Sequence, residues 1–180
     1  TPSFSWNELK NTLQIANEKK SQGIIWEASP AKFGSLPYLL AANTNLKDGT
    51  DVDETLRDFC NNLFGDAAES VYKMMQLWGA ENTAVSKHKL QLYLELMQTI
   101  DNKTQNAAQV IKERVRELKA YVHYMVMVYD LAADDRAKTS KEAKDAALCI
   151  YLAKTNRLQL VNSYYVITTI ASRYGSTSGF

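Results

Sequence analysis

A chain of 180 residues is long enough for one domain with a buried core and leaves little room for a second full domain. Its 21 basic and 20 acidic side chains leave a formal net charge of +1, which disfavours binding to nucleic acid or anionic lipid through charge alone. The longest apolar stretch, 121–131, is shorter than the about 18 residues needed to span a bilayer and is interrupted by His123 and Asp130, so we expect a core helix there.

The first 50 residues predict a helix, a strand and another helix. Apolar residues three and four apart, after a capping box formed by Ser5 and Glu8, predict a helix over about 6–20. The run 24–28 is apolar and partly β-branched and lies between a glycine and a proline, so it is the one convincing strand of the sequence. A second helix is expected after Ser35, which can cap it.

A single strand cannot satisfy its own backbone hydrogen-bonding groups. Helix, strand and helix is the order found in an α/β barrel or a doubly wound sheet, so we expect the partner strands of 24–28 to precede Thr1 in a longer protein. The alternative is a surface hairpin or an extended loop that packs on the helices.

Three helices are predicted next along the chain. Asp51 begins a capping box and starts the first helix, which ends at Gly65, and Asp66 starts the second, so that the two form a helical hairpin. The third is expected over about 86–100, with a break at 101–104. Their predicted apolar faces are Val52, Leu56, Phe59 and Leu63; Ala68, Val71, Met75 and Trp78; and Leu90, Tyr93, Leu94 and Met97.

Two long helices are predicted for the rest of the chain. A seam of apolar residues predicts a helix over 108–132, and Thr139 with Glu142 is expected to cap a last helix that reaches Tyr174. The seam comprises Ala108, Ile111, Val115, Leu118, Val122, Met125, Tyr129 and Ala132, and the last helix carries the stripe Ala146, Ile150, Ala153, Arg157, Leu160, Tyr164, Ile167, Ala171 and Tyr174. Two long helices joined by a short link lie antiparallel, and helix 86–100 can pack against both.

The sequence therefore predicts a mainly α protein in two parts. Residues 1–50 form a helix, strand and helix that look like the remnant of a barrel-like domain. Residues 51–180 form a helical bundle with long antiparallel helices.

The stretch 23–79 resembles a bacterial family catalogued as domain of unknown function 4838, whose members look related to the family 67 α-glucuronidases. The matching features are the strand end Trp26-Glu27, the helix with Leu39-Leu40-Ala41, the start Asp51-Val52-Asp53 and the corner 59–68. The family's corner usually reads Tyr-Gly-Pro-Ala-Ala, whereas here it reads Phe64-Gly65-Asp66-Ala67-Ala68, in which Asp, like Pro, suits a helix start. The resemblance implies a secreted or periplasmic parent with a glycoside-hydrolase-like barrel, of which this chain would be the carboxyl-terminal helical fragment.

Trp26 and Glu27 are the candidate substrate-binding residues of such a parent. Glu27 lies near the carboxyl end of the predicted strand, where barrel enzymes place functional groups, and Trp26 could stack on a sugar ring. Glycoside hydrolysis needs a second carboxylate about 5 to 10 Å away, and no other strand supplies one, so we predict no catalytic residue and no glycosidase activity in this chain alone. Packing or ion pairing is the alternative role for both residues.

No metal or cofactor is expected. His88 and His123 lie on different predicted helices without metal-binding spacing, and the sequence lacks the glycine-rich and GxSxG motifs of phosphate binding and acyl transfer. Cys60 and Cys149 belong to no CxxC pair, and we expect both to be buried free thiols. The seven tyrosines of the two long helices favour a wide helical interface over a sugar-binding surface.

Two functions are consistent with these observations, and we favour the first. In the first, the chain buttresses the catalytic barrel of a carbohydrate-processing protein, with the rest of that protein as its partner and carbohydrate as a further candidate ligand. In the second, it is a non-catalytic helical module that binds another protein. We also predict a dimer, or a remnant bound to the rest of its parent, that buries 23–40 with Trp26, Phe33 and Leu39.

Overall fold

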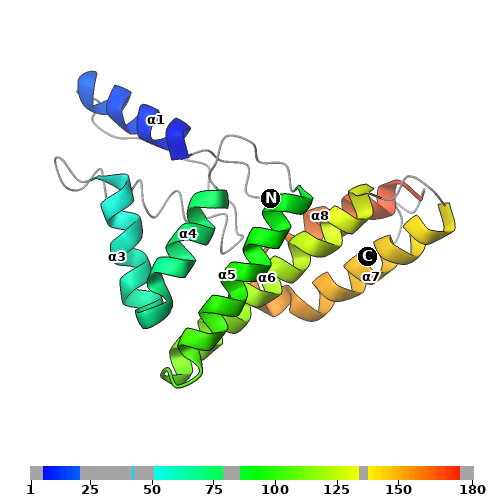
Figure 1. Ribbon diagram of the computed structural model, residues 1–180. Coiled ribbons are helices and arrows are strands. Elements are labelled where there is room, and N and C mark those ends of the chain that lie inside the picture. Colours follow the sequence, from blue (N-terminus) through cyan, green and yellow to red (C-terminus); the bar gives the residue numbers. More distant parts are fainter. Residues whose placement is uncertain (1–5, 21–41, 43–50, 79–85, 134–137, 175–180) are drawn as a thin grey trace.

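The computed structural model describes residues 6–20, 42, 51–78, 86–133 and 138–174 (Figure 1). Within these ranges the regular structure is helical throughout, which confirms the predicted mainly α bundle. The predicted strand 24–28, the helix after Ser35, the candidate residues Trp26 and Glu27, and the region 23–40 all lie outside the described residues.

The amino-terminal helix and the predicted hairpin are both present. Helix α1 spans Trp6–Glu18 and buries two of its leucines, Leu9 and Leu13. Helix α3 spans Val52–Phe64, and the Asp51 carboxylate caps it by accepting a hydrogen bond from the Asp53 amide at 3.0 Å. The short 3-10 turn η1, Gly65–Ala67, leads into α4, Ala68–Trp78.

The corner between α3 and α4 depends on one glycine. Gly65 has a φ of +52°, a backbone conformation that side chains disfavour, and its amide donates to the Asn61 carbonyl. Arg114 of a later helix reaches back to the same corner, where its guanidinium donates to the Leu63 carbonyl at 2.9 Å. The corner is therefore held both by its own backbone and by a helix that follows about fifty residues later.

The apolar faces predicted for α3 and α4 form part of the core. All four residues predicted for α4 are buried, as are Val52 and Leu56 of α3. Phe59 and Leu63 are partly buried and pack against the core, whereas Cys60 and Phe64 supply the further buried positions of α3. The face of α3 is thus wider than the single predicted row.

Helix α5 spans Lys87–Thr104 and runs antiparallel to α4 (Figure 1). The predicted break at 101–104 is wrong, because Thr104 is buried and donates its hydroxyl to the Ile100 carbonyl inside the helix, while Asp101 pairs with Lys119 at 2.6 Å. The burial of Thr104 and the ion pair of Asp101 with the next helix account for one more helical turn than the sequence predicts. Leu94, predicted to face the core, is 53% exposed.

Helix α6 spans Gln109–Ala133 and is the central helix of the bundle. Its predicted seam is confirmed at four positions, which are Val115, Leu118, Val122 and Met125, all buried. Tyr129 is partly buried and packs on the core, whereas Ala108 precedes the helix and is exposed. The principal contacts of α6 are with α5, α7 and α3.

The single last helix predicted from 139 to 174 is wrong. Helix α7 spans Lys138–Thr155, a 3-10 turn η2 follows at Asn156–Leu158, and α8 spans Ser163–Ser172. Gln159 adopts the left-handed conformation with φ +50°, and the Asn162 side chain caps α8 by accepting from the Tyr165 amide at 3.1 Å. Thr139 lies inside α7, so it is not the predicted cap.

The stripe predicted for that helix is mostly exposed, because α7 buries a different row of residues. Ile150 and Tyr164 are 56% and 76% exposed, and Ala146, Ala153 and Arg157 are exposed as well. The buried row of α7 is Asp145, Leu148 and Leu152. The three- and four-residue spacing of apolar side chains runs on across the turn, although the helix does not. The buried row begins with Asp145, which a search for apolar residues does not select.

Candidate functional site

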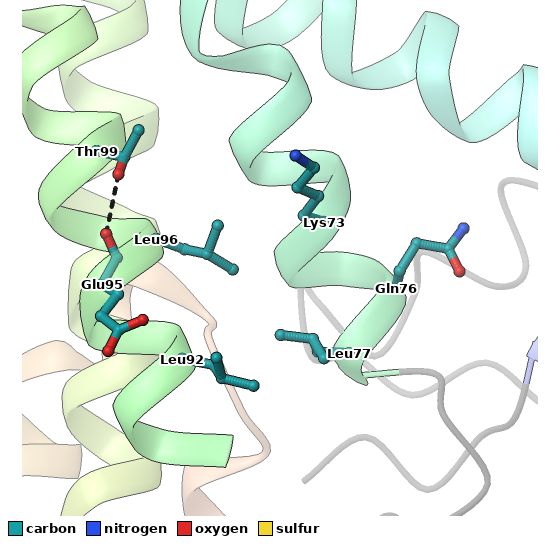
Figure 2. A pocket seen from close by; sticks show the side chains of 7 residues that line it. All are labelled: Lys73, Gln76, Leu77, Leu92, Glu95, Leu96 and Thr99. Carbon is teal, nitrogen blue, oxygen red and sulfur yellow. Dashed lines mark hydrogen bonds between the residues drawn. The ribbon is translucent and has the colours of Figure 1, made fainter. Parts of the chain in front are cut away.

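A groove of about 570 Å³ lies between α4 and α5. Figure 2 shows Leu92 and Leu96 projecting from α5 toward Lys73 and Leu77 of α4. The three leucines are only partly buried, so apolar surface stays open between two helices. Its lining residues are Lys73, Gln76, Leu77, Leu92, Glu95, Leu96 and Thr99.

The two charged residues that line the groove are of opposite sign, with Lys73 on α4 and Glu95 on α5. The Lys73 side chain is 62% exposed, and its one ion pair within the described ranges is a long 3.8 Å contact to Glu69. Glu69 is held more closely by Arg57, at 2.9 Å. On the other helix Glu95 is exposed and forms no ion pair with any described residue. One groove therefore presents a cation on α4 and an anion on α5.

A polar network fixes the α4 side of the groove. The Gln76 amide donates to the Asp53 carboxylate and lies 2.9 Å from the Tyr72 hydroxyl, while Asp53 accepts from Lys10 of α1 at 2.5 Å. Burial opposes ionisation of Asp53, but the hydrogen bonds from Lys10 and Gln76 outweigh it, so the pKa of Asp53 is lowered. The hydrogen bond to Asp53 likewise raises the pKa of Lys10. These contacts join α1, α3 and α4.

Buried aromatic side chains join α4 to α6 in the core. The rings of Trp78 and Tyr121 meet edge to face with centroids 5.1 Å apart, and Tyr124 follows at 6.1 Å from Tyr121. Burial raises the pKa of Tyr93 to about 12 and raises the pKa of Tyr121 as well. Their hydroxyls stay protonated at neutral pH, so this group packs the interior and is not a source of a base.

A buried carboxylate joins α7 to the end of α8. Asp145 is 1% exposed, accepts a hydrogen bond from the Tyr174 hydroxyl at 2.6 Å and lies 3.6 Å from an Arg173 nitrogen. The hydrogen bond to Asp145 raises the pKa of Tyr174 to about 12. The cluster holds α8 against α7, and both of its partners come from residues that immediately follow α8.

The histidines and cysteines do not come together. His88 and His123 are exposed on α5 and α6, and the ring of His123 lies 5.0 Å from that of Tyr151. Both cysteines are free thiols, as predicted; Cys60 is buried and Cys149 is partly buried. Among the described residues no group of three or more His, Cys, Asp or Glu side chains is arranged to hold a metal ion.

The tyrosines of α6, α7 and α8 fall into two populations. Tyr121 and Tyr124 are buried, and Tyr129 and Tyr151 are partly buried. The carboxyl-terminal ones are exposed, by 76% at Tyr164, 67% at Tyr165 and 44% at Tyr174. The wide helical interface expected from the seven tyrosines stays a prediction, and the three exposed ones are those open to a partner.

Sequence reasoning missed the groove. Leu92 and Leu96 are four residues apart, which is the spacing of one helical face, but this row lies beside the predicted row of Leu90, Tyr93 and Met97. A second apolar row on one helix was the available signal. Both rows are apolar, so which of them is buried depends on how the neighbouring helices pack.

No protein-family model, curated protein or solved structure matches this chain. Within the ranges that the structure describes, no helix combines the length and apolar character required to cross a bilayer.

Proposed function

We propose that this chain is a non-catalytic helical module that binds a helical protein surface along the groove between α4 and α5. The observation that carries the proposal is the open row of Leu77, Leu92 and Leu96, set between Lys73 and Glu95. An apolar stripe between two helices, bordered by charges, is the surface into which an amphipathic helix packs. The leucines would supply the affinity and the charges the orientation of the partner.

The chemistry of the groove supports binding over glycoside hydrolysis. Its lining contains one carboxylate, Glu95, whereas hydrolysis of a glycosidic bond uses a pair. Its other polar side chains are already occupied in part: Gln76 bonds to Asp53, and the Thr99 hydroxyl donates to the Glu95 carbonyl at 3.1 Å. The site thus offers surface and charge and lacks an acid and base pair.

The carbohydrate-processing hypothesis stays a prediction. It rests on the resemblance over 23–79, and its candidate residues Trp26 and Glu27 lie outside the described residues. A buttressing role beside a barrel would also use a helical binding surface, so the two hypotheses differ in the identity of the partner.

The test is peptide selection against the folded chain. We expect a display library of amphipathic helical peptides to yield binders whose affinity, measured by fluorescence anisotropy, falls about tenfold or more for Leu96→Asp. Leu94→Asp is the matched control, because Leu94 lies on the same helix, is 53% exposed and does not line the groove. Equal binding to both variants, or the absence of helical binders, would contradict the proposal.

A further inference from the structure

We infer that the partner of this groove is a second copy of the chain, with the α4 and α5 pair of one protomer packed on the same pair of the other around a twofold axis. The inference rests on the proposed function, because it concerns the same surface. Self-association through this face would bury the leucines that each protomer leaves partly open.

The arrangement of α4 and α5 is that of one layer of a four-helix bundle. The two helices are antiparallel neighbours (Figure 1), and Leu77, Leu92 and Leu96 line the groove between them (Figure 2). Two such layers stack with side chains of one filling the groove of the other. From Leu92 to Thr99 the groove extends over about two helical turns, roughly 10 Å, so the layers need to match only over a short length.

The charges of the groove are complementary to a copy of themselves. A twofold interface brings residue i of one protomer against residue j of the other, and j against i. Lys73 and Glu95, on opposite helices, would therefore form two reciprocal pairs. A partner with a uniformly basic or acidic face would meet one repulsive charge in this groove, whereas a twofold copy sets each of these two lining charges against its opposite.

The ion pairs and the buried leucines contribute differently to the proposed dimer. Exposed ion pairs are weak, so Lys73 and Glu95 would set the register of the dimer while burial of the leucines provides most of the attraction. The net charge of +1 per chain adds little repulsion between two copies.

Charge reversal in the full chain tests this inference. We expect sedimentation equilibrium at low salt to show a dimer for the wild type and about tenfold weaker self-association for K73E and for E95K. The double variant K73E/E95K should restore dimerisation, because both reciprocal pairs are re-formed with their signs exchanged. An equimolar mixture of the two single variants should associate more tightly than either alone.

Leu92→Asp should abolish the dimer, and Leu94→Asp should leave it intact. A wild-type chain that is monomeric at high micromolar concentration would overturn the inference, as would a dimer that is unchanged by Leu92→Asp and by both charge reversals. Binding of the selected helical peptides by a monomeric chain, lost in Leu96→Asp, would overturn only the identity of the partner. Monomeric chain without groove-dependent peptide binding would overturn the proposed function as well.

Discussion

Replacing Leu118 by Ala tests whether α6 is the centre of the core. Leu118 is fully buried, and α6 has principal contacts with three other helices, so the surrounding structure has little freedom to close on a cavity. Removing three buried carbons costs roughly 2.4 kcal/mol in transfer free energy at about 0.8 kcal/mol each, and the cavity adds to this. We expect a loss of about 3 to 5 kcal/mol in the free energy of unfolding.

Urea denaturation followed by far-UV circular dichroism measures this loss. Leu94→Ala is the control, since a side chain that is 53% exposed should change the free energy of unfolding by about 0.5 kcal/mol or less. A Leu118→Ala variant that loses less than about 0.5 kcal/mol, or no more than Leu94→Ala, would show that the seam of α6 is not packed as described.

Three further predictions concern titrating groups. Burial raises the pKa of Cys60 to about 12, so an aromatic disulfide reagent should modify Cys149 first in the native protein and Cys60 only on unfolding. The pKa of Asp53 is lowered from its usual 3.8 in the folded state. Ionised Asp53 therefore stabilises the fold above pH 3.8, and this stability is lost as the pH falls through the lower pKa of the folded state. Asp53→Asn should remove this acid dependence from the free energy of unfolding measured in urea. The pKa of Tyr174, raised to about 12, should return toward 10 in Asp145→Asn, as measured by tyrosinate absorbance against Tyr174→Phe.

A specific outcome would contradict each of these three predictions. Modification of Cys60 in the Cys149→Ser variant at the rate of an unfolded thiol would contradict its burial. An identical fall in stability between neutral and acid pH with and without Asp53 would mean that the Asp53 network adds nothing to folding. A tyrosine titration unchanged by Asp145→Asn would place Tyr174 away from that carboxylate.

Local patterns were sufficient to predict the central helices. Asp51 and Gly65 marked both ends of α3, and the three- and four-residue spacing around Leu118 and Val122 identified the buried side of α6. These features depend on nearest neighbours along the chain and on a core that is apolar throughout. The corresponding residues could therefore be assigned without knowledge of tertiary contacts.

Tertiary contacts decided the features that sequence reasoning missed. The turn between α7 and α8 uses Gln159 in a left-handed conformation and Asn162 as a cap, and neither is a strong break signal while the apolar spacing continues through Leu160. Asp145 lies on the buried row of α7 and accepts a hydrogen bond from Tyr174, a contact that no local pattern indicates. The groove likewise depends on packing, because Leu92 and Leu96 project toward α4 yet stay partly open while the neighbouring row of α5 is buried.

The order in which the helices pack has a consequence for folding. Most principal contacts join a helix to the next one along the chain, from α3 through to α8. Contacts between near neighbours in sequence require little loop closure, so the bundle should form rapidly and open locally from its carboxyl-terminal end. The contacts of η1 with α5 and of α3 with α6, where Arg114 bonds to the Leu63 carbonyl, join parts of the chain that lie farther apart. The Arg114 bond joins the two ends of the segment that contains α4 and α5, so we expect the four helices from α3 to α6 to unfold together, whereas α8 is tied to α7 through Asp145.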